Sequence, residues 1–201
     1  GRNVNQVSNL MLIGLIAGIL GARLSFAASN LAAFQGNYLS ILSLSPTMLD
    51  PIGGTAVGVI AGLVYGQRQK MIFWETLDLL TPGFAVFMIF LGLSNLVSGE
   101  GYGTPTNVPW GLQQWGEKRH PAQIYSILGA VLIFFLMFFR PGFKGLTPGG
   151  LFLGWLSMSS LVSIFLETFR GDSIIWGGGI RAGQVLSWVV LAITLILLGK
   201  R

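Results

Sequence analysis

Cysteine is absent from the sequence, and histidine occurs once, as His120. Without cysteine the chain can form neither a disulfide framework nor a thiolate metal site. A single histidine is too few for a centre in which several imidazole groups hold a transition metal. We therefore expect no metal site and no cofactor.

Charge is scarce as well, because charged residues make up 9% of the 201 residues, against roughly 25% in a soluble domain. Hydrophobic residues make up 52%, and the mean hydropathy is +0.70. Too little polar surface is left to cover a water-soluble particle, so lipid must surround most of the chain. The composition excludes a soluble domain and predicts an integral membrane protein.

Apolar runs close to the length of about 20 residues that spans a bilayer recur along the chain. They lie near residues 8–28, 52–66, 82–98, 122–139, 149–168 and 182–199. The uncharged stretch 38–50 is expected either to lie in the interface or to re-enter the bilayer. No segment has the ten-residue alternation of an outer-membrane barrel strand. The pattern predicts an all-α bundle of about six transmembrane helices in a single domain, residues 1–201.

The net charge of +5 indicates an orientation in the membrane and not a nucleic-acid partner. With six spans and both termini on one side, that side collects seven lysine and arginine residues and the opposite side four. Basic loops favour the cytoplasm, so we expect both termini to be cytoplasmic. The seven residues are Arg2, Arg68, Lys70, Arg140, Lys144, Lys200 and Arg201.

A few polar residues lie at membrane depth, where a charge is costly and usually tied to function. Arg23 lies within the first span, and Asn95 and Glu100 lie at the end of the third. Glu167 and Arg170 close the fifth span, three residues apart, which allows them to pair on one helical face. In the expected topology these groups gather around a cavity that opens toward the non-cytoplasmic leaflet.

The loop 99–125 is rich in aromatic residues, and Trp110 and Trp115 are interpreted as anchors at the headgroup level. His120 precedes Pro121 at the start of the fourth span. It could act as a general base, because its ordinary pKa is near 6.5, or it could cap the helix. The 29 glycines, some spaced four residues apart on one helix face, indicate close helix packing.

Taken in order, these motifs resemble the prolipoprotein diacylglyceryl transferase family over nearly the whole chain. The matching segments are G-A-R-L at 21–24, D-x-x-x-P at 78–82, the signature at 92–103, P-W-G at 109–111, R-H-P-x-Q-x-Y at 119–125, E-x-F-R at 167–170 and G-Q-x-L-S at 183–187. The signature keeps Asn95, Glu100, Tyr102 and Gly103. The segment 119–125 is the most specific of these motifs.

The resemblance implies a multi-pass protein of the bacterial inner membrane with a cytoplasmic C-terminus and, in this sequence, no counterpart of the first family helix. It also implies transfer of a diacylglyceryl group from phosphatidylglycerol to a lipobox-containing prolipoprotein. The tentative catalytic residues are His120, Glu100 and Glu167. The residues expected to bind the phospholipid are Arg23, Asn95, Tyr102, Arg119, Gln123 and Arg170.

The sequence departs from the family pattern at positions that would carry the chemistry. The family histidine of the second span is Ile52, and two family arginines are Gly92 and Ser163. Other departures are Phe26, Ser98 and Ser159. The transfer needs a deprotonated thiol and a phosphate leaving group held by cations, and losing one electrostatic contact of that kind costs ~10²–10³ in rate.

Two functions follow from this pattern. The first is a diverged relative that binds an anionic phospholipid such as phosphatidylglycerol, with Arg23, Arg119 and Arg170 on the headgroup. Transfer of the diacylglyceryl group is not the expected activity, although these arginines and His120 could substitute for the lost groups. The alternative is a non-catalytic subunit of a larger membrane complex, such as an energy-converting one, with other membrane subunits as partners. A solute transporter is less favoured, because the two halves show no internal repeat.

Overall fold

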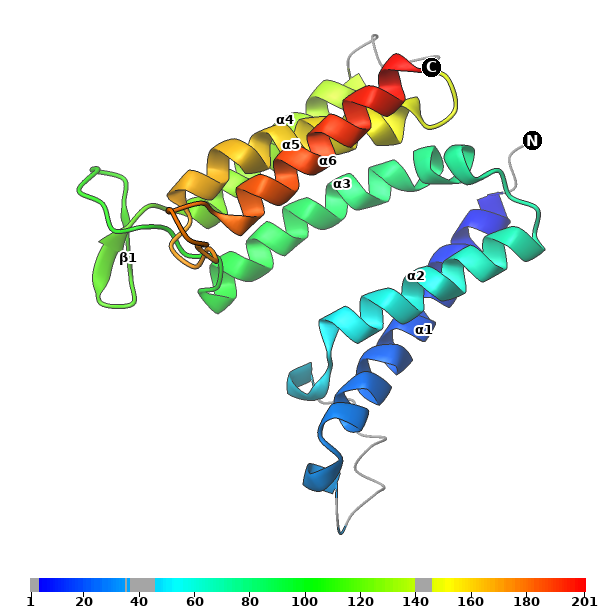
Figure 1. Cartoon of the computed structure of the whole chain (residues 1–201), viewed down its shortest axis with the longest axis horizontal. Coiled ribbons are helices and arrows are strands. Elements are labelled where there is room, and N and C mark those ends of the chain that lie inside the picture. Colours follow the sequence, from blue (N-terminus) through cyan, green and yellow to red (C-terminus); the bar gives the residue numbers. More distant parts are fainter. Residues whose placement is uncertain (1–3, 35, 37–45, 140–145) are drawn as a thin grey trace. The chain divides into compact units, whose positions relative to one another are not determined.

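The computed structural model of the chain describes residues 4–34, 36, 46–139 and 146–201. This part consists mainly of six α-helices with one short β-hairpin, which confirms the expected all-α membrane fold (Figure 1). The helices are α1 (Val4–Ser29), α2 (Pro51–Arg68), α3 (Phe73–Ser98), α4 (Ala122–Phe139), α5 (Gly150–Leu166) and α6 (Ala182–Gly199). The shorter elements are the 3₁₀ helices η1 (Leu31–Phe34), η3 (Pro46–Met48) and η5 (Glu167–Phe169) and the strands β1 (Leu112–Gln114) and β2 (Glu117–Arg119).

Five of the described helices are long and apolar enough to cross a membrane: α1, α3, α4, α5 with η5, and α6. The glycine-rich α2 has 18 residues and is not among these five. Helix α3 begins at Phe73, earlier than the expected residue 82, and contains Pro82. A proline removes one helical hydrogen bond, and here the helix continues through it. Residues 38–45 of the uncharged stretch lie outside the described residues.

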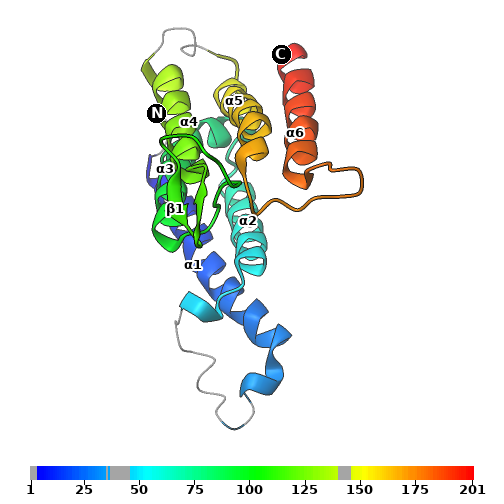
Figure 2. The same ribbon diagram turned by 90° about the vertical axis from the view of Figure 1, so that its left-hand side faces the viewer.

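The chain divides into two units, Gly1–Thr76 and Leu77–Arg201. In the first unit, α1 and α2 lie side by side along their glycine faces (Figures 1 and 2). A Cβ atom on Gly58 would lie 2.8 Å from the carbonyl oxygen of Gly14, and one on Gly54 would lie 2.8 Å from that of Gly18. Backbone atoms thus occupy the space that a side chain would need. These glycines allow the two helices to approach closely, as small residues do in membrane bundles.

Alanine at position 58 is expected to destabilise the protein by about 1–3 kcal/mol, the usual cost of overpacking. The reason is that the added methyl group meets backbone, which cannot rotate away. Gly62 lies on the same helix, and a Cβ there meets no atom within 4 Å. Gly62→Ala should therefore be neutral or stabilising by up to about 1 kcal/mol, since alanine favours the helix. Thermal unfolding of the two variants in one detergent measures the difference, and equal losses would contradict the packing explanation.

In the second unit, α4, α5 and α6 pack with the greater part of α3. Helices α5 and α6 are joined by a buried hydrogen bond of 2.8 Å from the Ser157 hydroxyl to that of Thr194. Helices α3 and α5 are joined by the stacked rings of Phe84 and Trp155, whose centroids are 5.8 Å apart. Asp78 on α3 also accepts hydrogen bonds from the backbone at the start of α5. These contacts fix the helices that surround the site.

The segment between α3 and α4 and the segment between α5 and α6 meet at the end of this bundle where α3 ends and α4 begins. Residues 99–121 contain the β1–β2 hairpin, which extends away from the helix ends (Figure 1). The backbone N–H of Thr104 donates to the carbonyl of Phe169 at 2.8 Å, and that of Gly171 donates to the carbonyl of Tyr102 at 2.8 Å. Backbone pairing therefore holds the segment after α3 against the segment after α5.

Candidate functional site

A cavity of about 160 Å³ lies between α3, α4 and α5 in the second unit. Asn95, Glu167 and Arg170 line one end of it, and Ala85 and Trp155 line the other. Ten residues separate Ala85 from Asn95, which is about 15 Å along a helix. The cavity is therefore elongated along the helices, with ionic and amide groups at one end and apolar side chains at the other.

Small residues on α5 and its neighbours create the hollow. Ser126, Ser159 and Ser163 all line it. Gly92 on α3 lines it too, although a Cβ atom there would lie 2.6 Å from Cγ1 of Ile127, so its small size serves the packing of α3 on α4. Ser159 and Ser163 are four residues apart and so share one face of α5. The side chain of Ser163 is exposed, whereas that of Ser159 is partly buried. The cavity thus opens sideways near Ser163 and has Ser159 further inside.

Glu167 supplies the carboxylate at the polar end. Its side chain is only 12% exposed, and its Oε2 atom lies 3.9 Å from Nε of Arg170. A Cβ atom on Gly183, at the start of α6, would lie 2.6 Å from the carboxyl carbon of Glu167. Glycine at position 183 therefore leaves the room that this carboxylate occupies.

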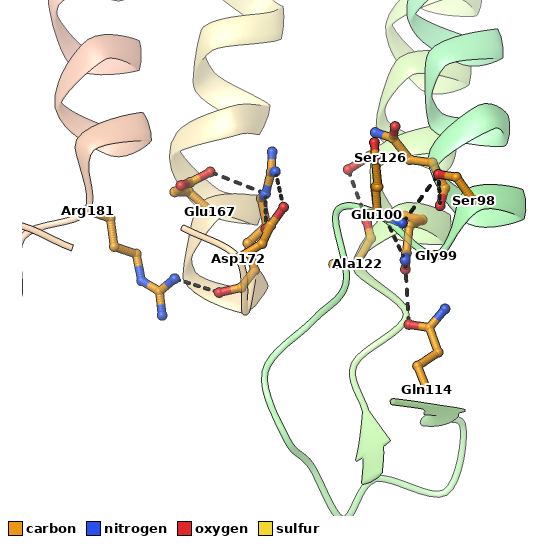
Figure 3. Close-up of polar contacts among 12 residues, drawn as sticks. Ser98, Gly99, Glu100, Gln114, Ala122, Ser126, Glu167, Asp172 and Arg181 are labelled. Carbon is orange, nitrogen blue, oxygen red and sulfur yellow. Dashed lines mark hydrogen bonds and ion pairs between the residues drawn. The ribbon is translucent and has the colours of Figure 1, made fainter. Parts of the chain in front are cut away.

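Arg170 is held by Asp172, which no sequence pattern indicated as part of the site. Nε and Nη2 of Arg170 donate to the two carboxylate oxygens of Asp172 at 2.9 and 2.8 Å. Nη1 of Arg181 donates to the Arg170 carbonyl at 2.6 Å. Figure 3 shows Glu167, Asp172 and Arg181 at the adjoining ends of α5 and α6. Two cations and two carboxylates thus lie together where α5 ends and α6 begins, and of these Glu167 and Arg170 line the cavity.

The ion pair shifts the acidity of both partners. The hydrogen bond to Asp172 raises the pKa of Arg170 above its ordinary value. Burial alone would raise the pKa of Asp172, but the hydrogen bonds and charge of Arg170 outweigh it, and the pKa of Asp172 is lowered below 3.8. The pair therefore remains fully charged at every pH in the neutral range.

This lowered pKa predicts how stability depends on pH. Because the folded-state pKa of Asp172 lies below the unfolded value, its stabilising contribution is fully present above about pH 4 and is lost as the pH falls through the folded-state pKa. The difference in unfolding temperature between the wild type and Asp172→Asn should be constant from about pH 8 to 5. It should shrink only in more acidic buffer. A difference that already changes near neutrality would assign the effect to another group.

Arg119 lies in the extramembrane segment and does not line the cavity. Its Nη2 atom pairs with Glu117 at 2.8 Å, and its Nη1 atom donates to the Gly103 carbonyl at 3.2 Å. The guanidinium carbon lies 5.0 Å from the ring centroid of Tyr102, within the range of a cation–π contact. Arg119 and Tyr102 thus form one cluster beside the hairpin.

His120 belongs to an aromatic cluster. Its Nδ1 atom is 3.3 Å from the hydroxyl of Tyr125, which accepts a hydrogen bond of 2.8 Å from Nε1 of Trp110. The ring of Phe169 packs edge-on against His120, with centroids 5.1 Å apart. His120 is placed outside the cavity lining, so proton transfer to a ligand there would need a relay or a movement.

Glu100 and Gln123 meet at the junction of α3 and α4. The carbonyl of Glu100 accepts a hydrogen bond of 2.9 Å from Nε2 of Gln123. Gln123 is 2% exposed. Figure 3 shows Glu100 at this junction. The side chain of Glu100 is exposed. Glu100 and Gln123 therefore join two helices without lining the cavity.

Arg23 lies in the first unit, where it is 4% exposed. Its Nη1 atom donates to the carbonyl of Met48 at 2.9 Å, and its guanidinium lies 5.3 Å from the ring centroid of Phe34. Ile52, where the resemblance implied a histidine, is 82% exposed in the same unit. Arg23 thus binds the segment between α1 and α2.

Of the nine residues expected at the site, Asn95, Glu167 and Arg170 line the cavity. Sequence reasoning missed Asp172 and Ser126, and it named Gly183 only as part of the motif at 183–187. No spacing rule indicated any of the three as part of the site. No group of three His, Asp or Glu side chains that could hold a metal occurs within the described ranges. The roles of the individual site residues remain predictions.

The bundle defines a multi-pass membrane protein whose cavity is polar at one end and apolar at the other. A family model described as prolipoprotein diacylglyceryl transferase matches residues 1–199. The chain belongs to this family, which confirms the resemblance. Membrane helices and bacterial relatives together place it as a multi-pass protein of the inner membrane.

Three relatives carry the name phosphatidylglycerol–prolipoprotein diacylglyceryl transferase. The protein of Finegoldia magna is 27% identical over 193 residues, which cover 96% of this chain and 77% of the relative. The protein of Clostridioides difficile is 27% identical over 190 residues, covering 94% and 75%. The protein of a Nostoc species is 26% identical over 208 residues, covering 96% and 73%.

Proposed function

We propose that the chain binds an anionic phospholipid, phosphatidylglycerol, in the cavity of the second unit and does not transfer its diacylglyceryl group. The observation that carries this proposal is the polarity of the cavity, with Asn95, Glu167 and Arg170 at one end and apolar side chains at the other. A phospholipid has the same division between a charged headgroup and apolar chains. A cavity of about 160 Å³ holds only part of the molecule, so the acyl chains would extend through the opening near Ser163 into the bilayer. The relatives' name includes phosphatidylglycerol.

The polar end offers suitable groups for this headgroup. Nε and Nη2 of Arg170 are used by Asp172, and none of the described residues bonds its Nη1 atom. The N–H groups of that atom are donors for a phosphate, which arginine binds well. Asn95 and Glu167 supply oxygen acceptors for the hydroxyl groups of the glycerol. The balance of charges at this end suits a headgroup that has both one phosphate and hydroxyl donors.

The residues that line the cavity are the reason why we expect no transfer of the diacylglyceryl group. Gly92 and Ser163 stand where the family motifs have arginines, and Ser159 stands where they have a tyrosine. None of the three can offset charge on a phosphate leaving group. With each lost electrostatic contact costing ~10²–10³ in rate, the remaining Arg170 does not sustain the reaction. We propose in addition that the C-terminus is cytoplasmic, so that the polar end lies at the outer leaflet.

Native mass spectrometry tests lipid binding. The protein is extracted with its surrounding lipid by a styrene–maleic acid copolymer, transferred to detergent, and analysed for lipids that survive delipidation. We expect one phosphatidylglycerol per chain, enriched over its share of the membrane. Retention of phosphatidylethanolamine and phosphatidylglycerol in the membrane's own ratio would contradict selective binding. Fixed protein partners in the same spectra would favour the subunit hypothesis.

A further inference from the structure

The loop between α5 and α6 presents an apolar surface that is separate from the cavity. Residues 173–180 contain no charged side chain. Ile174, Ile175, Trp176 and Ile180 are exposed to 70%, 60%, 54% and 52%. Four large apolar residues within one short loop form a patch of the kind that marks an interaction surface.

The backbone of this loop satisfies much of its own hydrogen bonding. The N–H of Trp176 donates to the carbonyl of Ile180 at 2.8 Å, and the N–H of Ala182 donates to that of Ile174 at 2.9 Å. Gly178 and Gly179 have φ angles of +82° and +81°, which glycine adopts without strain and which reverse the chain at the tip. Such a closed turn exposes few unpaired polar groups, as an apolar environment requires.

The charged residues near the loop lie at its base. Arg170 and Asp172 pair with each other, and Arg181 donates to the backbone of Arg170. Gly171 is bonded to the carbonyl of Tyr102. The base is thus fixed and internally neutralised, and the apolar tip projects from it.

The location of the loop indicates that its apolar surface contacts the lipid bilayer. It joins two helices that are apolar enough to span a membrane, one ending at Phe169 and the other beginning at Ala182. Figure 2 shows it extending sideways past α6 near the level at which that helix begins. The exposed apolar face of α6, which includes Leu186 and Val189, continues this surface into the bilayer. A tryptophan at this level is typical of a membrane interface.

We propose that the tip of this loop, residues 174–180, inserts into the boundary between headgroups and acyl chains of the leaflet at which α6 begins. The inserted residues would anchor the adjoining ends of α5 and α6, and with them Arg170, at headgroup depth. Because the tip does not line the cavity, its insertion does not depend on whether the cavity binds a phospholipid.

The absence of native cysteine allows single spin labels to measure depth in the full-length protein in lipid nanodiscs. Labels are placed at Ile175→Cys and, on the other arm of the loop, at Ile180→Cys. Gln113→Cys in β1 is the control for water, and Leu195→Cys on the exposed face of α6 is the control for lipid. Collision rates with oxygen and with a water-soluble nickel chelate are compared for all four positions.

Insertion predicts an oxygen-to-nickel collision ratio at positions 175 and 180 that is several-fold above that at 113 and approaches that at 195. A ratio equal to that at 113 would place the loop in water and overturn the proposal. Exclusion of both reagents would also overturn it, because the tip would then be covered by protein.

Discussion

Phenylalanine at position 159 is expected to abolish lipid retention while leaving the fold intact. Ser159 lies inside the cavity, whose volume is about 160 Å³. A cavity of about 150 Å³ is filled by one benzene molecule, so a single phenyl ring would take up most of this space. Ser159 is only partly buried and borders the cavity, so a ring there can occupy existing space without displacing backbone. The amount of phosphatidylglycerol retained per chain should fall by at least about tenfold, equivalent to 1.4 kcal/mol.

Leu161→Phe is the matched control for this variant. Leu161 lies on the same helix, is 58% exposed and does not line the cavity. It should retain as much phosphatidylglycerol as the wild type in native mass spectra. Equal retention by Ser159→Phe and Leu161→Phe would show that the lipid binds elsewhere on the protein.

The largest loss of stability is expected for Asp78→Ala. Asp78 lies on α3, and its Oδ2 and Oδ1 atoms accept hydrogen bonds from the backbone N–H groups of Gly149 and Phe152 at 2.6 and 2.9 Å. Gly149 precedes α5 and offers that helix no side-chain cap. The carboxylate therefore satisfies donors that would remain unpaired in lipid. Hydrogen bonds to a charged group contribute about 1.5–3 kcal/mol each, so removal of both should cost about 3–6 kcal/mol.

Asp78→Asn keeps the shape of the side chain and changes only its hydrogen bonding. Its amide can accept from one N–H group but not from both, because its nitrogen is a donor. We expect roughly half the loss seen for alanine. Unfolding of wild type and both variants in the same detergent gives the order wild type, asparagine, alanine. Equal stability of all three would show that Asp78 does not hold α5 in place.

Helices are the most predictable part of this protein because each membrane-spanning segment must be a long apolar run. Two helices differ from the expectation: α2 is not among those apolar enough to cross a membrane, and α3 begins earlier than expected because Glu75, Asp78 and Pro82 interrupt the apolar pattern there. Asp78 faces the start of α5, seventy-one positions away in sequence, and no local rule reveals that partner. Tertiary hydrogen bonding thus accounts for the carboxylate of Asp78 within an otherwise apolar helix.

The cavity could be predicted only in part. Glu167 and Arg170 were recognisable because charged groups at membrane depth are rare and costly. The hollow itself depends on where Ser159 and Ser163 face after the helices pack, and small residues on a membrane helix serve close packing equally well. Asp172 was missed because a pairing in a loop has no spacing rule comparable to that of a helix.

The central claim is that the chain binds phosphatidylglycerol without carrying out the transfer reaction. The most direct test incubates the purified protein in nanodiscs with phosphatidylglycerol, radiolabelled in its acyl chains, and a lipobox peptide that contains one cysteine. The account predicts that each chain retains labelled phosphatidylglycerol and that no labelled peptide forms. A peptide carrying a thioether-linked diacylglyceryl group would contradict it and show that Gly92, Ser159 and Ser163 are compatible with catalysis.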